Sequence, residues 1–366
     1  MKKAILFFIL ALSNLVFSQN NYCLEGQIGK SKIYMDLENS DSDFLATYFY
    51  QKSLKNILLE GTRKKDTLIL EVNQEDKIIE KFELIKSTTN NFTGFWTNEK
   101  GEKFPVTLNP INFLEYKKNP RIKVENKLDV IKLNLMAFKQ DSISMFQGRK
   151  ILWYSEKHCI SPFFRLGENF AEKTKSAVNP ILEIIQLENT LAQLNCTSRF
   201  EYNTGTGIEY TTNITFLNAN LLGFHVFSSW DCGAAHPDFG GTGYLLDLNN
   251  GKSFSIEDVL AFDKSVTTEK KGGFDAFSKY RSTFFAPKLL ALINESQHFK
   301  KPKDTDSDCD YTDLDSWDFP SWSYTSKGIE FTPYFYRAAR SCEEPFLVPF
   351  SKLEKYKNKA FAYPFK

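Results

Sequence analysis

Residues 230–260 read WDCGAAHPDFGGTGYLLDLNNGKSFSIEDVL, and structure-forming segments alternate here with turn residues. The apolar segment 244–248 is followed by Asn249, Asn250 and Gly251, a combination typical of the tight turn that ends a strand. Ser255 and Asp258 have the spacing of a capping box, so a short helix is expected to begin there. A strand, a turn and a capped helix in close succession predict an α+β domain with an antiparallel sheet and helices.

The sequence on both sides of this stretch mixes strand and helix patterns. Strands are expected near 208–216, 221–229, 328–336 and 346–349. Asn179 and Pro180 predict a helix start, with Asn179 as the N-cap and Pro180 in the first helical position. A longer helix is expected at 274–298, interrupted at Pro287. We therefore expect one α+β domain over residues 125–366.

The N-terminal third has a different character, because no helical period is visible in it. Short alternating segments are separated by polar turn clusters, and strands are expected at 32–36, 44–50, 57–60, 67–72, 78–84, 92–96 and 104–108. This spacing predicts an antiparallel β domain, as a sandwich or a small open barrel, over residues 19–115. The proline-punctuated polar stretch 110–127 is the expected boundary.

The first residues have the pattern of a secretory signal peptide. Lys2 and Lys3 precede the apolar run 4–15, and cleavage is expected before Gln19, so residues 1–18 form the predicted signal. Cys23 does not follow a lipobox, and no later stretch is long and apolar enough for a membrane span. The protein is therefore expected to be exported, either periplasmic or secreted.

The charge balance argues against nucleic acid as a partner. The chain has 46 basic and 45 acidic residues, and removal of Lys2 and Lys3 leaves 44 against 45. Binding of phosphate backbones depends on a clustered excess of Lys and Arg, which is missing here.

The cysteines predict disulfides rather than a metal or redox site. Six are present, an even number, and no C-x-x-C occurs. An exported protein meets an oxidising compartment, where such cysteines pair. The favoured pairs are Cys309–Cys342 and Cys159–Cys196, and neither a metal nor a cofactor is expected.

His236 is the most conspicuous candidate for chemistry, because histidine can act as a general base or a hydrogen-bond donor. It lies in a Gly- and Pro-flanked loop, where its ring can equally hold the turn through backbone carbonyls. Asp231 is near it in sequence, but sequence proximity does not establish a catalytic pair. The acidic run 304–310 suggests a calcium loop, but Cys309 replaces the glycine that an EF-hand needs, so a solvated loop is preferred.

Aromatic and basic residues offer candidate contact surfaces. Trp230, with Trp317 and Trp322, falls close to the loops and can stack on a sugar or pack in the core. A second candidate surface precedes Cys342, because Tyr and Arg are favoured at interfaces, and it contains Tyr334, Tyr336, Arg337 and Arg340. The chain has no nucleophile-elbow, metalloprotease, P-loop or dinucleotide-binding motif.

Two groups of segments carry a resemblance to a known family. The first is WDCGAAHP at 230–237, YLLDLNNGK at 244–252 and IEDVL at 256–260, and the second is YTSKGIEF at 324–331 with VPFSKL at 348–353. Their order and content resemble the RsiV-like C-terminal domain family, over about residues 150–366. The chain departs from the pattern in having Gly-Ala-Ala-His-Pro, preceded immediately by Cys232.

The resemblance implies an exported α+β domain of largely unknown function. Members of the family include the lysozyme-binding part of an anti-sigma factor and a companion of a peptidoglycan deacetylase module. We therefore expect a non-catalytic cell-envelope binding protein, with a lysozyme-like protein or a peptidoglycan-related glycan as its partner. The alternatives are a cell-wall hydrolase or deacetylase-associated enzyme using His236, and an envelope assembly factor. Function does not transfer safely with fold, so the site has to decide among them.

Overall fold

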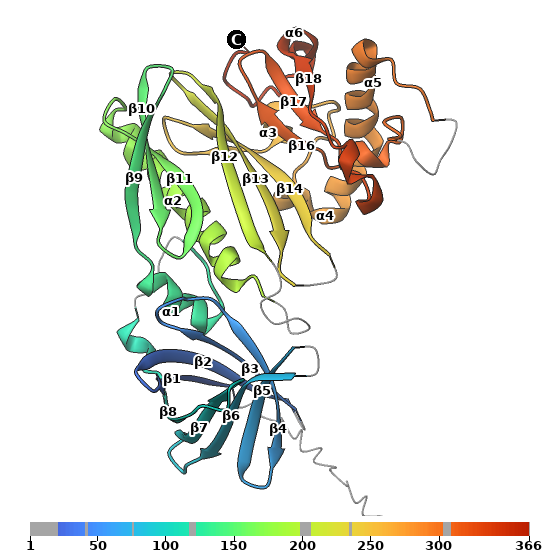
Figure 1. The fold of residues 1–366 in the computed structure, drawn as a ribbon. Helices are drawn as coiled ribbons and strands as arrows, with labels where there is room; N and C mark the ends of the chain where they lie inside the picture. Colours follow the sequence, from blue (N-terminus) through green and yellow to red (C-terminus); the bar gives the residue numbers. More distant parts are fainter. Residues whose placement is uncertain are drawn as a thin grey trace, which may run out of the picture. The chain divides into compact units, whose positions relative to one another are not determined.

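The computed structural model describes residues 21–40, 43–74, 77–116, 122–197, 206–233, 236–302 and 309–365, and the predicted signal at 1–18 lies outside them. The chain divides into two compact units, Met1–Glu115 and Tyr116–Lys366 (Figure 1). Antiparallel sheets dominate and a few helices accompany them, which confirms the α+β class.

The first unit is an eight-stranded antiparallel barrel in which each strand pairs with the next along the chain. Its strands are β1 (Tyr22–Ile28), β2 (Ser31–Ser40), β3 (Asp43–Tyr50), β4 (Ile57–Lys64), β5 (Thr67–Gln74), β6 (Lys77–Lys86), β7 (Phe92–Asn98) and β8 (Lys103–Pro110). The prediction of a sandwich or an open barrel is wrong, because β1 pairs with β8 and closes the sheet. Closure removes both open edges, which removes sites for unwanted pairing with other chains.

The barrel interior holds a polar cluster as well as apolar side chains. The Tyr48 hydroxyl donates to the Glu80 carboxylate, and Trp96 Nε1 donates to Glu80 Oε2 at 3.1 Å. Burial raises the pKa of Tyr48 above its usual range, so the phenol remains the donor. The buried carboxylate is thus satisfied by two aromatic donors.

The described residues of the second unit form three antiparallel sheets (Figure 1). One comprises β9 (Phe138–Phe146), β10 (Arg149–Glu156) and β11 (Cys159–Leu166). The central sheet comprises β12 (Gly207–Leu217), β13 (Leu221–Asp231), β14 (Asp238–Asp247) and β15 (Ser253–Phe254). The third comprises β16 (Ser321–Tyr324), β17 (Gly328–Thr332) and β18 (Phe346–Pro349).

The helices of this unit are α1 (Lys127–Leu135), α2 (Glu172–Asn195), α3 (Ile256–Val259), α4 (Glu269–Tyr280), α5 (Ala286–Gln297) and α6 (Phe350–Leu353). The predicted helix start at Asn179 is wrong, because α2 begins at Glu172 and contains Pro180. The Asn179 side chain bonds instead to the backbone N–H and carbonyl of Leu166, at 2.8 and 3.1 Å. It therefore fixes the end of β11 to the helix. A π-helical turn, Arg281–Phe285, joins α4 to α5.

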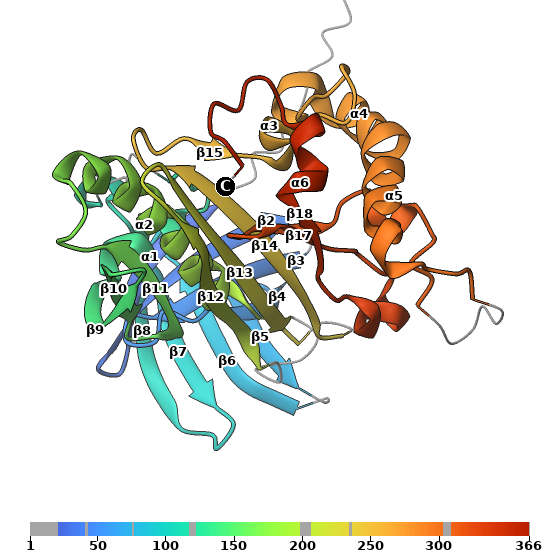
Figure 2. The same cartoon turned by 90° about the horizontal axis from the view of Figure 1, so that it is seen from above.

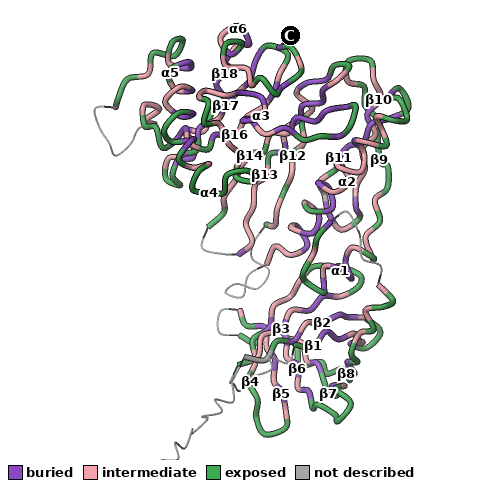
Figure 3. The backbone as a smooth tube through the Cα atoms, turned by 180° about the vertical axis from the view of Figure 1, so that it is seen from behind, coloured by how far each residue is buried: buried purple, intermediate pink, exposed green. Residues whose placement is uncertain are grey.

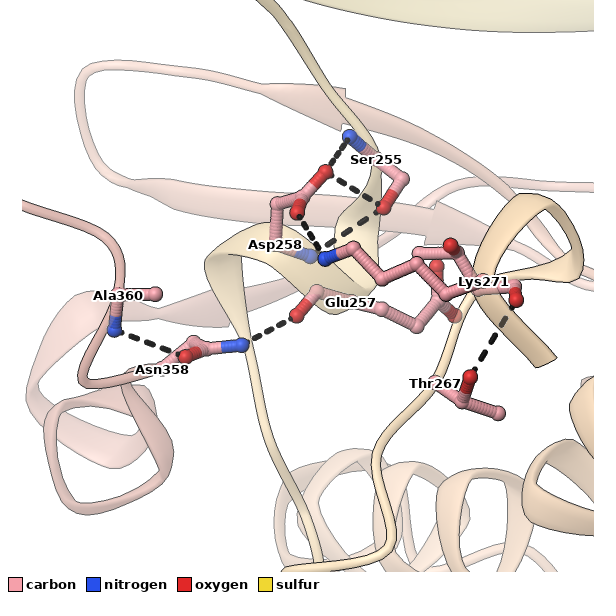
Figure 4. A network of polar contacts seen from close by, with 8 residues as sticks. Ser255, Glu257, Asp258, Thr267, Lys271, Asn358 and Ala360 are labelled. Carbon is pink, nitrogen blue, oxygen red and sulfur yellow. Dashed lines mark hydrogen bonds and ion pairs between the residues drawn. The ribbon is translucent and has the colours of Figure 1, made fainter.

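The predicted capping box opens α3, as Figure 4 shows. Ser255 Oγ accepts from the Asp258 backbone N–H at 3.2 Å, and the Asp258 carboxylate accepts from the Ser255 N–H at 3.0 Å. Lys271 approaches the same carboxylate at 3.5 Å, and the Asn358 amide donates to the Glu257 carbonyl at 2.7 Å. The short helix is thereby tied to α4 and to the C-terminal segment.

The central sheet separates two hydrophobic cores (Figure 2). On one side, α2 and the β10–β11 strands cover Phe224 and Val226 of β13. On the other side, β16–β18 and helices α3 to α6 enclose a second core around Trp317, Tyr324 and Phe331. Figure 3 shows that buried positions concentrate on these contact faces, whereas the edge strand β9 is almost wholly exposed.

Two disulfides are formed in this unit, which confirms the expectation of disulfide bonding. Cys309 pairs with Cys342, and Cys196 pairs with Cys232, with Cα–Cα distances of 5.5 and 4.9 Å. The predicted pair Cys159–Cys196 is wrong. Cys159 lies beside the Thr190 carbonyl, with its Sγ 3.9 Å from that oxygen, and a helical rise of about 1.5 Å per residue places Cys196 roughly 9 Å further along.

Among the helices of the described residues, none combines the length and the apolar character needed to cross a membrane.

Candidate functional site

A hollow of about 600 Å³ lies where the central sheet meets the third sheet. Its walls come from β12, β13 and β14 on one side and from β16, β17 and the segment 333–345 on the other. On β14 the consecutive residues 238–241 line the hollow. Elsewhere side chains alternate between the two faces of a strand, so every second residue of β12, β16, β17 and the middle of β13 lines it. His225 and Phe227 line it, for example, whereas Phe224 and Val226 are buried in the opposite core.

Several residues that line the hollow are polar. Asn213 and His225 are opposite each other on β12 and β13, and both line it. The third sheet contributes two further opposed pairs, Ser321 with Thr332 and Ser323 with Glu330. These groups offer donors and acceptors that a polar ligand can bind.

The close approach of the two sheets depends on glycines in β14. A Cβ atom on Gly243 would lie 1.6 Å from the Trp322 carbonyl oxygen, and one on Gly241 would lie 2.4 Å from the His225 ring. Any larger residue would therefore force β16 away from β14. The run Phe239-Gly240-Gly241-Thr242-Gly243 is the local sequence feature that shapes the hollow.

Large aromatic rings line the same hollow. Phe227, Phe319 and Tyr334 line the hollow while remaining 39%, 43% and 56% exposed, and Trp230 and Phe239 line it as well. The Phe227 and Phe239 rings are 5.9 Å apart and tilted by 36°. Exposed rings gathered in one concavity typically mark a binding surface rather than ordinary packing.

Arg340 is the one basic side chain among the described residues that line the hollow. Its guanidinium lies 3.3 Å from Asp238 Oδ1 and 3.2 Å from Glu343 Oε1, and it also donates to the Phe239 carbonyl. It sits over the rings of Phe239 and Tyr334, 4.7 and 4.6 Å from their centroids. Burial raises the pKa of Glu343, and the neighbouring Arg340 opposes that shift. The buried arginine thus holds the 333–345 segment against the end of β14.

His225 is the histidine that the hollow contains. Its Nε2 lies 3.1 Å from Ser321 Oγ, which joins β13 to β16. Burial lowers the pKa of His225, because the protonated ring loses solvation there. The imidazole is therefore neutral at physiological pH and can both donate and accept one hydrogen bond.

The residues proposed from the sequence are only partly brought together. Trp230, Tyr334 and Arg340 line the hollow, whereas Asp231, His236, Tyr336 and Arg337 do not. His236 is exposed in the β13–β14 loop. Arg337 donates to the Pro237 carbonyl at 2.9 Å, so it anchors that same loop. Asp231 accepts from the Gly233 N–H at 3.1 Å and shapes the turn.

Tyr336 faces a separate small hollow of about 120 Å³, which Asp310 and Asp313 also line. Residues 304–308, most of the acidic run 304–310, lie outside the described residues. Asp310 accepts from the Thr312 N–H at 2.9 Å, as in an ordinary polar turn. Across the described ranges, no group of three or more His, Cys, Asp or Glu side chains could hold a metal ion.

Comparison with known proteins gives similarity to solved structures only. No family model matches the chain, and no curated protein matches it. The crystal structure of a DUF3298 family protein from Pseudomonas aeruginosa PAO1 matches 62% of this chain and 94% of its own, with 13% identity and a TM-score of 0.32. A DUF3298 member from Bacteroides fragilis has the same coverage, with 12% identity and a TM-score of 0.34. DUF3298 is the RsiV-like domain family.

Proposed function

We propose that this protein is an exported, non-catalytic cell-envelope binding protein and that the hollow in its second unit takes a peptidoglycan-related glycan. The observation that carries the proposal is the combination of polar side chains with exposed aromatic rings in one concavity of about 600 Å³. Sugars present hydroxyl and amide groups at their edges and C–H groups on their faces. A site for them therefore needs polar partners and flat rings together.

The structure supplies both kinds of group from rigid elements. The polar contacts Asn213, Ser323 and Thr332 lie on strands, whose positions are fixed by two cores and by the contact at Gly243. Phe227 also projects from a strand, and Tyr334 is held by its stacking on Arg340. Because the side chains of such a site are already ordered, little conformational entropy is lost when a ligand binds.

Two further observations support an exported binding role. The disulfides Cys196–Cys232 and Cys309–Cys342 are consistent with an oxidising compartment. The motifs at 230–260 and 324–353 resemble an exported binding domain. A lysozyme-like protein is the other partner that this resemblance implies, but a concave site of small volume suits a glycan better than the surface of a folded protein.

An enzymatic function is the second candidate, and the pair His225–Ser321 is what favours it. Their separation of 3.1 Å is within the range of a nucleophile and its base. However, no carboxylate among the described residues bonds to the His225 ring to orient it, and His236 lies outside the hollow. Turnover of muropeptides that Ser321→Ala abolishes would favour the enzyme over the binding protein.

Cosedimentation with purified peptidoglycan tests the proposal through a matched pair of tyrosines. Tyr334 lines the hollow and Tyr336 does not, although both are exposed, at 56% and 67%. Tyr334→Ala is expected to weaken binding about fivefold or more, because a stacking ring is lost, whereas Tyr336→Ala keeps wild-type binding. Absence of binding by the folded protein, or equal loss in both variants, would contradict the hollow as the site.

A further inference from the structure

We infer that the occupant of the hollow carries a protonated amine, so that its preferred glycan is an amino sugar with a free amino group rather than an N-acetylated one. The inference rests on the proposed function and specifies the chemistry of its ligand. It follows from the balance of charges in the hollow, from one carboxylate that has no basic partner in the described ranges, and from the rings around it.

The hollow has more negative than positive charge. Three carboxylates line it, those of Asp238, Glu330 and Glu343, and Arg340 supplies the single positive charge among the described lining residues. Three negative charges and one positive leave a net charge of minus two. His225 adds none while it is neutral. A concave surface with a net negative charge attracts cations and disfavours anionic ligands.

Glu330 is the carboxylate of the hollow that has no basic partner within the described part of the chain. It lies on the central strand of the third sheet, opposite Ser323 of β16 and Leu347 of β18, and is half-buried. Arg340 pairs with Asp238 and Glu343, and no basic side chain of the described residues pairs with Glu330. A partly desolvated carboxylate without a cation gains most from a ligand that brings one.

The aromatic rings that line the hollow also favour a ligand with a positive charge. The chain already places one cation in this environment, since the Arg340 guanidinium lies over Phe239 and Tyr334 with carboxylates on either side. Phe227 and Trp230 line the same hollow without a cation over them among the described residues. Ring faces attract cations through their negative quadrupole. Arg340 thus balances one of the two negative charges of Asp238 and Glu343, and the ligand amine is inferred to balance that of Glu330.

An N-acetylated sugar lacks this complementarity. Its acetamide is neutral, so it would cover the Glu330 carboxylate without balancing its charge. The inferred preference for a free amine is therefore electrostatic, and it should weaken as salt screens the pair.

Isothermal titration with two matched tetrasaccharides tests the inference. One is the β-1,4-linked glucosamine tetramer and the other is its N-acetylated form, compared at about pH 6, where the glucosamine amines are largely protonated. The wild-type protein is expected to bind the free-amine oligomer about tenfold more tightly, and less so in high salt. Glu330→Gln should remove this preference without loss of folding. Glu209→Gln is the control, because Glu209 is exposed on β12 and does not line the hollow.

The outcomes separate the inference from the proposed function. Equal or tighter binding of the N-acetylated oligomer overturns the inference and leaves the glycan site intact. A preference that survives Glu330→Gln overturns the assignment of the amine to that carboxylate. If the folded protein binds neither oligomer, both the inference and the glycan site fail.

Discussion

The two faces of the central sheet are built from the same strands but differ in almost every physical respect. On the face toward α2, Phe224 is fully buried, with its ring 5.3 Å from that of Phe164 and stacked 4.7 Å from that of Tyr244. On the other face, Phe227 remains 39% exposed and His225 is only half-buried. The α2 face is packed in one core. On the other face, Leu221 and Leu245 pack in the second core, and only the part that lines the hollow is left open to a ligand.

The difference shows how the alternation of side chains between the two faces of a strand supports both stability and binding. Burial of large rings on the α2 face removes apolar area from water, which is the main source of folding free energy. On the opposite face, the part that lines the hollow contributes less folding free energy, because its rings are partly exposed and its polar groups are not covered by apolar side chains. Proteins keep such unfavourable features mainly where a ligand completes them.

Replacing one phenylalanine on each face should give the largest difference in stability between the two faces. Phe224→Ala is expected to lower the free energy of unfolding by about 3–5 kcal/mol, since it leaves a cavity among buried rings. Phe227→Ala should cost less than about 1 kcal/mol but weaken glycan binding. Urea denaturation gives both values. Similar losses of stability in the two variants would mean that the hollow face is also a packing face.

Replacing two glycines of β14 by alanine, one at a time, should give a smaller difference in stability. Gly243→Ala is expected to lower the free energy of unfolding by about 2 kcal/mol, because its Cβ meets the Trp322 carbonyl and pushes the sheets apart. Gly240→Ala is the matched control, since its Cβ would lie 3.8 Å from the Trp230 ring, an ordinary contact. Thermal unfolding of both variants measures the difference. Comparable melting temperatures would contradict the close approach of β16 to β14.

The smallest expected effect concerns pH. Burial lowers the pKa of His225, so the unfolded chain takes up a proton near the ordinary value of 6.5 while the folded chain resists it. The stability from the neutral ring is therefore complete above about pH 6.5 and is lost as the pH falls toward the folded pKa.

The neutral variant His225→Gln isolates this effect, because Gln can keep the hydrogen bond to Ser321 without titrating. The wild type should lose up to about 1 kcal/mol more than the variant between pH 7.5 and 5.5, as measured by urea midpoints. Parallel pH profiles for the two proteins would show that the ring is not protected from protonation.

Local features of the fold could be predicted from the sequence. The capping box at Ser255 and Asp258 formed because its partners are three residues apart. Pairings between distant segments could not be predicted. Barrel closure depends on the register of Leu24 with Pro110, which no local pattern encodes. The edge strand β9 escaped prediction because its exposed residues lack the alternation of a half-buried strand.

The same limit applies to the candidate site. Trp230 was proposed because it falls close to the motifs, and Tyr334 and Arg340 because Tyr and Arg are favoured at interfaces. All three line the hollow. His225 and Glu330 were missed because each is one polar residue inside an apolar strand, and the hollow forms only when strands about a hundred residues apart meet. The available signal was the glycine-rich run at 239–243, which indicates a close approach of another backbone.

The tryptophan indoles provide the most direct test of the central claim, that the hollow binds the glycan. The chain has five, and Trp230 alone lines the hollow, whereas Trp96 is in the barrel, Trp153 on β10, Trp317 in the core and Trp322 on β16. In a nitrogen-15 NMR titration with the glucosamine tetramer, the Trp230 indole signal, assigned with Trp230→Phe, should shift the most. A saturable shift centred on Trp96 or Trp153, with Trp230 unmoved, would contradict the account.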